Sequence, residues 1–363
     1  MALDEALEPW LRLSLTPGLG DESFRRLLVA FGSPEAILAS PSREIARIVP
    51  ARLAADIERG PPQDALARAA AWLEDPANAV VTLGDPRYPQ LLLQIPDPPP
   101  LLYVKGRAEL LGGPALAIVG SRHATPHGVA LAESFATTLS DAGLTIVSGL
   151  ALGIDAAAHR GGLAGRAKSI AVVGTGLDIV YPARNRALAH ALAASGALLS
   201  EFPLGTGPIA SNFPRRNRVI SGLARGCLVI EAAAQSGSLI TARLANEQGR
   251  DVFAVPGSVH SPLAKGCHQL IKQGAKLVES ALDVLEELRL PQPTPPPSGA
   301  APAAQSDARE AALLEHLGYD PCDIDTLVAR SGLAAEVVSA LLTQLEIAGR
   351  VAAIPGGKYQ RVR

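Results

Sequence analysis

Short apolar runs alternate with helical patterns between residues 114 and 290. The runs lie at 116–119, 144–147, 169–173, 197–200, 227–230 and 251–255. Continuous apolar runs of this length are typical of strands that are buried on both faces. The segments between them are long enough for crossover helices. The pattern therefore predicts an α/β domain with a doubly wound, mostly parallel sheet.

The stretches before this domain have different patterns. Residues 1–75 repeat apolar positions at helical spacing, as at Phe24, Leu27 and Leu28, and predict an all-helical domain. Within it, Gly18 and Gly20 allow two interpretations. In the first, they form a helix-hairpin-helix turn that offers N–H groups to a DNA phosphate. In the second, they only allow a tight connection between two helices of a small bundle. The second is favoured because the segment is net acidic. Residues 76–113 are rich in proline and are expected to be a connector that packs on the next domain.

The end of the chain predicts a second small domain. Residues 291–305 carry no charge and abundant proline and alanine, which is typical of a semi-rigid linker. Residues 306–363 then predict a helix, a turn, a second helix and a hairpin, the order of a winged helix. Its second helix carries only the charges Glu336 and Glu346, so a contact with protein is expected there rather than duplex DNA.

Composition narrows the class of protein. Hydrophobic residues make up 48% of the 363 positions, which excludes a disordered chain. The three cysteines are far apart and fit no metal-ligand spacing, so we expect no metal and a reduced, cytoplasmic setting. No signal peptide or run of about 18 apolar residues is present, so no membrane insertion is expected. Residues 114–290 carry 16 basic and 12 acidic residues, which places any polyanion contact there.

Glycine-bearing loops follow the predicted strands and should gather along one edge of the sheet. Such loops and the helix N-termini behind them present N–H groups and partial positive charge to an anion. Arg122 adds a planar fork of donors that fits phosphate. The candidate residues of these loops are Gly120, Ser121, Arg122, Gly149, Gly174, Gly176, Ser236, Gly237 and Ser238. Neither a GxGxxG fingerprint nor a Walker A lysine is present.

Residues 212–218 hold the densest group of chemically active side chains. Phe213 lies among Arg215, Arg216, Asn217 and Arg218. An aromatic face beside guanidinium groups allows an unpaired base to stack while its phosphate is neutralised. The alternative is a core phenylalanine beside a solvated basic face, and residue types alone do not decide between them. The three arginines cannot all point the same way on one helix.

Candidate catalytic groups are sparse. Asp155 and His159 lie four residues apart on a predicted helix, where a cap and a satisfied histidine are favoured over catalysis. Glu231 follows a strand, where an acid could hold a ribose or act as a base. His123 and His127 are near Arg122 and could contact phosphate or only solvent. No nucleophile, paired-carboxylate or metal constellation is formed.

Together these motifs resemble the DNA-processing protein A family, also called DprA or Smf. The matching stretches are residues 118–122, 147–159, 171–182, 200–205, 213–222, 236–242 and 252–257. They cover almost the whole middle domain. The flanking domains also match, since this family often carries a sterile-alpha-motif-like (SAM-like) helical unit and a C-terminal winged helix.

The resemblance implies an extended Rossmann-like fold that binds single-stranded DNA without catalysis. It further implies a homodimer formed through the Rossmann domain, protection of incoming DNA, and loading of the RecA recombinase in natural transformation. Arg122 would contact phosphate and Phe213 would stack on a base. Some relatives carry a basic residue three positions before that phenylalanine, where this chain has Ala210. Arg215 or Arg216 could replace it.

A different class is a nucleotide-binding Rossmann enzyme, such as a phosphoribohydrolase. Those enzymes carry a Pro-Gly-Gly-x-Gly-Thr loop with a nearby glutamate. This chain has Gln235-Ser236-Gly237-Ser238 after Glu231 and lacks that loop.

Overall fold

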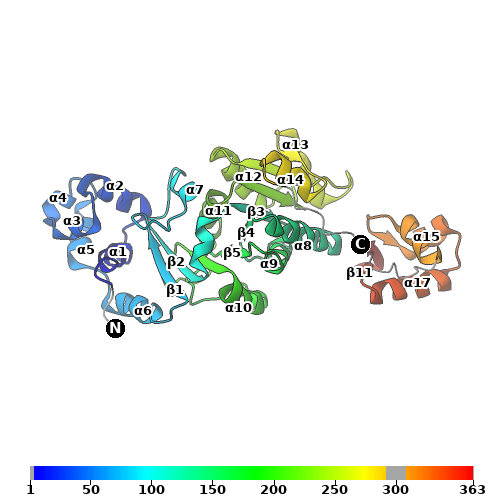
Figure 1. The fold of residues 1–363 in the computed structure, drawn as a ribbon, viewed down its shortest axis with the longest axis horizontal. Helices are drawn as coiled ribbons and strands as arrows, with labels where there is room; N and C mark the ends of the chain where they lie inside the picture. Colours follow the sequence, from blue (N-terminus) through cyan, green and yellow to red (C-terminus); the bar gives the residue numbers. More distant parts are fainter. Residues whose placement is uncertain (1–3, 292–307, 363) are drawn as a thin grey trace.

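The computed structural model describes residues 4–291 and 308–362, which form three parts along one axis. A helical unit, blue in Figure 1, lies at one end, an α/β domain lies in the middle, and a small orange-to-red unit lies at the other end. The linker expected at 291–305 falls outside the described residues from position 292 onward. In the parts of the chain that are described, no single helix is long and apolar enough to cross a membrane, although the bent pair Ile324–Ser331 and Ala335–Ile347 passes by length and composition together.

A nine-stranded sheet forms the middle of the molecule, in the order β1-β2-β6-β5-β4-β3-β7-β8-β9. All six predicted strands are present and pair parallel with one another, and the doubly wound sheet is confirmed. The strands are β1 (Asn78–Thr82), β2 (Leu101–Gly106), β3 (Ala115–Gly120), β4 (Thr145–Ser148), β5 (Ser169–Val172), β6 (Ala197–Ser200), β7 (Gly226–Ile230), β8 (Asp251–Ala254) and β9 (Lys276–Leu277).

Helices cover both faces of this sheet. Alternate residues of β3 point to opposite faces: Leu116 and Ile118 face one layer, and Ala117 and Val119 face the other. The first layer holds α8 (Pro126–Asp141), α9 (Ile154–Ala164), α10 (Arg186–Ser195) and α14 (Ala281–Glu287). The second holds α7 (Gln90–Leu93), α11 (Asn212–Leu223), α12 (Ser238–Glu247) and α13 (Lys265–Lys272). Short 3-10 turns lie at η1 (Ala108–Gly112), η2 (Ala183–Asn185) and η3 (Pro262–Ala264).

The proline-rich stretch expected as a connector contributes β1 and β2 to the same sheet. These two strands pair antiparallel with each other, and β2 pairs antiparallel with β6. Val81 and Leu102 are fully buried, so this hairpin shares the core of the α/β domain.

The N-terminal helical unit has its own apolar core, which includes Leu13, Phe24 and Ile37. Its helices are α1 (Glu8–Ser14), α2 (Asp21–Phe31), α3 (Pro34–Ala39), α4 (Ser42–Ile45), α5 (Ala51–Arg59) and α6 (Gln63–Trp72). The turn between α1 and α2 lines a cavity of about 370 Å³ together with residues of the α/β domain. Gly18 has a φ of 82° there, so glycine allows this tight connection.

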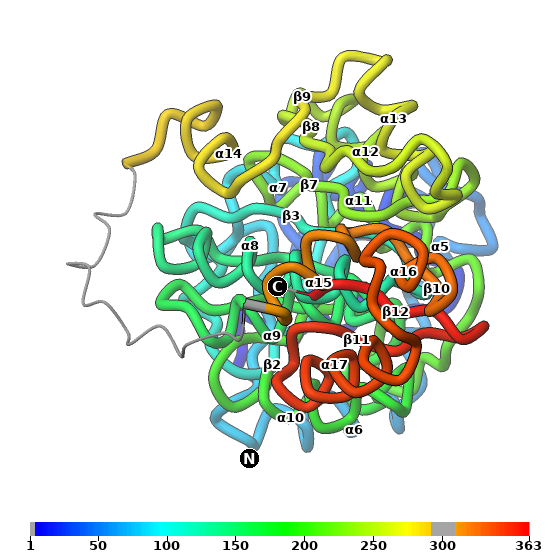
Figure 2. Tube along the Cα trace, turned by 90° about the vertical axis from the view of Figure 1, so that its right-hand side faces the viewer, coloured from blue at the N-terminus to red at the C-terminus, as the bar shows by residue number. Residues whose placement is uncertain are grey.

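The C-terminal unit is a winged helix, as predicted. It consists of α15 (Ala308–Leu317), β10 (Cys322–Asp323), α16 (Ile324–Ser331), α17 (Ala335–Ile347), β11 (Val351–Ile354) and β12 (Lys358–Arg361). Asp323 caps α16 by accepting from the Thr326 N–H at 2.7 Å, and Gly332 ends it in the left-handed conformation. Figure 2 looks along the long axis with this unit in front; Tyr319 contacts His127 at the start of α8, with ring centroids 5.4 Å apart.

Candidate functional site

A cavity of about 740 Å³ opens beyond the carboxyl ends of β3 and β7. The chain leaves β3 toward one face of the sheet and leaves β7 toward the other, so this is the point where parallel sheets of this type bind ligands. We call it the strand-end pocket. Nine of the residues predicted from the sequence line it: Gly120, Ser121, Arg122, Phe213, Arg216, Asn217, Ser236, Gly237 and Ser238.

Close backbone packing at the end of β3 explains the glycines there. A Cβ on Gly120 would lie 1.9 Å from the carbonyl oxygen of Ile230 on β7. Gly153, before α9, has a φ of 76°, and a Cβ there would lie 2.2 Å from the Ser121 carbonyl oxygen. Only glycine fits either position, and both therefore keep the turn that carries Arg122 against the sheet.

One face of α11 supplies a buried cation to the strand-end pocket. The Arg216 side chain is 5% exposed and donates from Nη1 to the Gly149 carbonyl at 2.7 Å and also to the Val172 carbonyl. Its Nε has no hydrogen-bond partner within the described residues. Burial lowers the pKa of this guanidinium to about 10, so it is charged at neutral pH. A fixed cation at a pocket wall favours an anionic ligand.

An aromatic pair lies beside this cation. Phe213 on α11 and Tyr181 have ring centroids 5.5 Å apart, tilted by 39°. The Phe213 ring lies over Gly174, where an added Cβ would be 3.0 Å from its Cδ1. The glycine thus provides the space that the ring occupies. Tyr181 is 45% exposed and was not among the predicted site residues.

The remaining walls of the strand-end pocket are polar. Arg122 is exposed, and its side chain forms no ion pair within the described residues. The first turn of α12 carries no acidic residue, and Ser236 and Ser238 contact each other through their hydroxyls at 2.7 Å. Asp155 also lines the pocket, accepts from the Gly149 N–H at 3.1 Å, and has a pKa raised by burial. The charges of the lining therefore favour a negative ligand.

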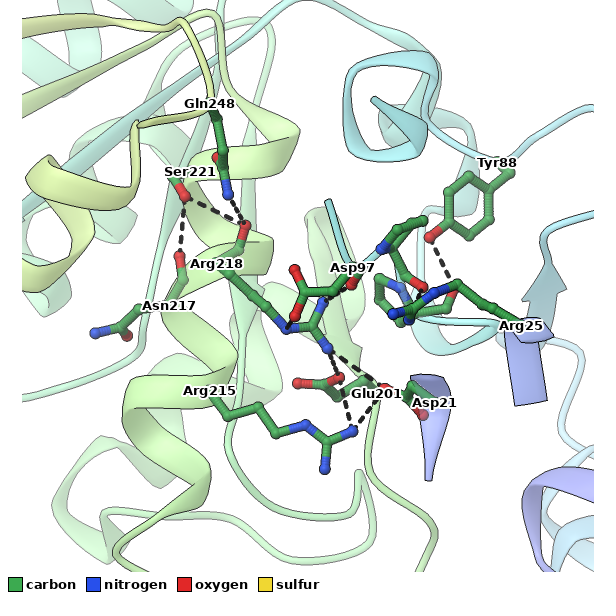
Figure 3. A network of polar contacts seen from close by, with 12 residues as sticks. Asp21, Arg25, Tyr88, Asp97, Glu201, Arg215, Asn217, Arg218, Ser221 and Gln248 are labelled. Atoms are coloured by element: carbon green, nitrogen blue, oxygen red, sulfur yellow. Dashed lines mark hydrogen bonds and ion pairs between the residues drawn. The ribbon is translucent and has the colours of Figure 1, made fainter. Parts of the chain in front are cut away.

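Five predicted residues do not line the pocket. Gly149 and Gly174 lie directly behind Arg216 and Phe213, while Gly176 donates its N–H to the Thr206 carbonyl at 2.9 Å. For Arg215 and Arg218 the sequence-based grouping with the pocket needs correction. Both side chains leave the other side of α11 and pair with carboxylates (Figure 3). Helical geometry explains this, because residues three apart share a face and adjacent residues do not.

The candidate catalytic groups are held by structural contacts. His159 is fully buried, accepts from the Leu150 N–H at 3.2 Å, and shares a 2.7 Å hydrogen bond with the Ser169 hydroxyl. Burial lowers its pKa to about 3, so it is neutral at physiological pH. Glu231 accepts from the Thr125 N–H at 2.8 Å and so anchors the start of α8. His123 lines the strand-end pocket, whereas His127 faces the winged helix.

Tyr181 and Asp155 are two of the pocket residues that the sequence-based prediction of the site did not include. Tyr181 is one of only five tyrosines and directly precedes Pro182, and its rarity was the available signal. Asp155 was identified as a cap; it also reaches the pocket wall. In the described ranges, no group of three or more His, Cys, Asp or Glu side chains could hold a metal ion.

Two family models match this chain. The model described as DNA recombination-mediator protein A matches residues 79–289, and the model described as DprA winged helix domain matches residues 293–357. The first match spans the nine-stranded sheet together with the strand-end pocket.

Curated relatives and solved structures agree with these matches. Protein Smf of Escherichia coli K12 is 42% identical over 308 residues, which cover 83% of this chain and 82% of that protein. DNA processing protein DprA of Streptococcus pneumoniae R6 is 49% identical over 203 residues, which cover 56% of this chain and 72% of that protein. The X-ray structure of DprA from Streptococcus pneumoniae superposes with a TM-score of 0.70 at 38% identity, covering 79% of this chain and 99% of that one.

A further solved structure concerns the single-stranded DNA binding mode of DNA processing protein A from Helicobacter pylori. It superposes with a TM-score of 0.53 at 29% identity and covers 58% of this chain and 95% of that chain.

Proposed function

The chain belongs to the DNA recombination-mediator protein A family, also called DprA or Smf, and from this membership we propose that its strand-end pocket binds single-stranded DNA. The observation that carries the proposal is that Arg122, Arg216 and Phe213 line one cavity. An arginine fork neutralises a phosphate, and a phenyl ring stacks on an unpaired base. The relative from Helicobacter pylori is described by its single-stranded DNA binding mode, which supports the proposal.

The two arginines have different roles in this proposal. Arg216 is held by two backbone carbonyls, so it loses little conformational freedom when a phosphate enters the pocket beside it. Arg122 is exposed and can follow the strand as it enters. Phe213, backed by Gly174 and Tyr181, offers a supported face for stacking. A base inside a duplex is stacked on both sides, so the site favours a single strand.

We further propose that binding occurs without catalysis. The side chains that would act as acids or bases in an enzyme are engaged in hydrogen bonds within the fold. The Asp155 carboxylate bonds to Gly149, the His159 ring to Leu150 and Ser169, and Glu231 to Thr125. The finer roles of the family are part of this proposal. They are a homodimer through the α/β domain, protection of incoming DNA, RecA loading in natural transformation or recombination, and a cytoplasmic location.

Fluorescence anisotropy with a labelled oligothymidine and a duplex of equal length tests the binding site. We expect the wild type to prefer the single strand, and Phe213→Tyr to bind like the wild type because it keeps an aromatic face. Phe213→Leu should weaken binding by about fivefold or more, since stacking contributes about 1–3 kcal/mol per base. Phe31→Leu, the same change on a partly buried ring of α2, serves as the matched control. Equal binding by Phe213→Leu and the wild type would exclude stacking at this position.

The same preparations distinguish the enzyme class. Incubated with nucleoside monophosphates, the protein should release no free base. Turnover at ordinary enzyme rates, about 1 per second or faster, would replace the binding proposal by the phosphoribohydrolase-like one.

A further inference from the structure

The face of α11 that points away from the strand-end pocket carries a second charged group. Arg215 Nη2 lies 2.6 Å from Asp21 Oδ2, and Arg218 Nε lies 3.0 Å from Asp97 Oδ2. Both guanidinium groups also contact Glu201, Arg215 at 3.4 Å and Arg218 more closely. Figure 3 shows these five side chains converging between α11 and the segment of α2 that carries Asp21. We call them the α11 cluster.

The α11 cluster joins segments that are distant in the sequence. Asp21 is the first residue of α2 in the helical unit, Asp97 precedes β2, and Glu201 follows β6. A neighbouring contact strengthens the same junction: Arg25 of α2 donates to the Pro98 carbonyl at 2.9 Å. The helical unit is therefore tied to α11 and to the loop before β2 by directed polar contacts.

Burial makes this junction specific. The Glu201 side chain is 1% exposed and that of Arg218 is 8% exposed. Removing such charges from water costs free energy that the pairing only offsets, so a buried cluster selects one arrangement more than it adds stability. Displacing the helical unit or α11 would separate these charges and leave them buried without partners. The free-energy cost of such unpaired buried charges disfavours every displaced position.

The geometry of α11 connects the cluster to the pocket. Arg215 and Arg216 are adjacent, so their side chains leave the helix about 100° apart, one toward each site. Val219 and Ile220 of the next turn are buried against the sheet. A rotation or shift of this helix thus moves Arg215 and Arg218 together with Phe213 and Arg216, because a packed helix moves as a rigid element.

We propose that the α11 cluster locks the helical unit onto the back of α11 and thereby positions Phe213 and Arg216 for the single strand. Asp21, Arg215 and Glu201 are positioning residues in this scheme and touch no DNA. The inference rests on the proposed function of the strand-end pocket. It assigns the N-terminal helical unit a role in DNA binding that needs no contact between that unit and DNA.

A charge-reversal cycle on the Asp21–Arg215 pair tests the proposal. Both side chains are partly exposed, at 26% and 45%, so each tolerates substitution better than the buried pair. We expect Asp21→Arg and Arg215→Asp each to weaken single-strand binding by about fivefold or more, the usual range for coupling between sites. The double variant, which restores an ion pair of reversed polarity, should bind within about twofold of the wild type.

The sign of the Asp21→Arg effect separates positioning from direct contact. A positive charge added beside a DNA-contacting Arg215 would strengthen binding, whereas a broken lock weakens it. Glu22→Arg makes the same charge change at the next position, which is exposed, and should leave binding unchanged. Asp21→Asn provides a milder version should Asp21→Arg fold poorly. Tighter binding by Asp21→Arg, or no recovery in the double variant, would overturn the proposal.

Two further measurements distinguish a failure of the proposed lock from a failure of the proposed function. Amide hydrogen exchange in α2 should be faster in each single variant and return to the wild-type rate in the double variant. If the wild type binds a single strand and loses binding with Phe213→Leu, the proposed function stands whatever the cycle shows. If the wild type does not bind single strands at all, the proposed function fails and the lock has no role in binding.

Discussion

Arg122 offers the cleanest test of phosphate contact, because its removal disturbs little else. The side chain is exposed, lies at the turn after β3, and forms no ion pair within the described residues. Arg122→Ala should therefore fold with the stability of the wild type, and any change in affinity reports on the ligand. Arg216 would not serve, since its loss leaves two buried carbonyls without their donor.

The expected magnitude follows from counterion release. On a single strand, each neutralised phosphate contributes about −0.7 to the slope of log K against log salt. Arg122→Ala should flatten the slope by about that amount. Between about 50 and about 200 mM salt, a fourfold change, the ratio of wild-type to variant affinity should then fall by a factor of about 2.6.

Anisotropy titrations at four or five salt concentrations measure this slope directly. Phe213→Leu is the matched comparison: it removes an uncharged stacking contact, so it should lower affinity equally at every salt concentration. If the lines for Arg122→Ala and the wild type are parallel, Arg122 neutralises no phosphate and its proposed role in DNA binding is wrong. A flattened line for Phe213→Leu would show that the ring also orders a charged contact.

Three further predictions follow from individual contacts. Gly174→Val should displace the Phe213 ring and weaken single-strand binding by about fivefold with an unchanged salt slope; unaltered binding in the same titrations would mean that the ring is not supported there. Gly120→Ala forces a methyl group against the Ile230 carbonyl and should lower the free energy of unfolding by about 3 kcal/mol or more, as measured by denaturant titration; a loss below about 1 kcal/mol would contradict the tight strand contact. Burial raises the pKa of Glu201 to about 7 from an ordinary value of 4.5. Between these two values the folded state holds a proton that the unfolded chain releases. The stabilisation that this proton provides is therefore lost as pH rises through about 7. Relative to Glu201→Gln, the wild type should therefore lose about 2 to 3 kcal/mol between about pH 5 and about pH 8 in chemical denaturation, and parallel pH profiles would refute the raised pKa.

The sheet was predictable because its signal is local. Each parallel strand is buried on both faces, so it reads as an apolar run such as 227–230, and parallel strands bring their following loops to one edge. Gly120 and Ser236 could thus be placed near each other although 116 positions separate them. Phe213 and Arg216 belong to the same site for the same reason, since α11 begins beside that edge.

The parts that could not be predicted depend on distant partners. Helical spacing places Arg215 and Arg218 on one face of α11, but nothing local indicates that this face meets Asp21, which is 194 residues away from Arg215. Likewise, the proline-rich surroundings of residues 78–106 conceal two strands, of which β2 joins the sheet by pairing with β6. Charge pairing and antiparallel edges are properties of the assembled fold, so patterns along the chain do not specify them.

The order of the strands in the sheet decides when the strand-end pocket can form during synthesis. Ala117 of β3 pairs with Cys227 of β7, while on its other side Ala115 pairs with Thr145 of β4. At about 5–20 residues per second, a ribosome needs on the order of ten seconds to synthesise the chain from β3 to β7. During that interval the nascent chain holds the helical unit and at most the strands β1 to β6, so one side of β3 is unpaired. The strand-end pocket is therefore among the last features of the domain to form on the ribosome.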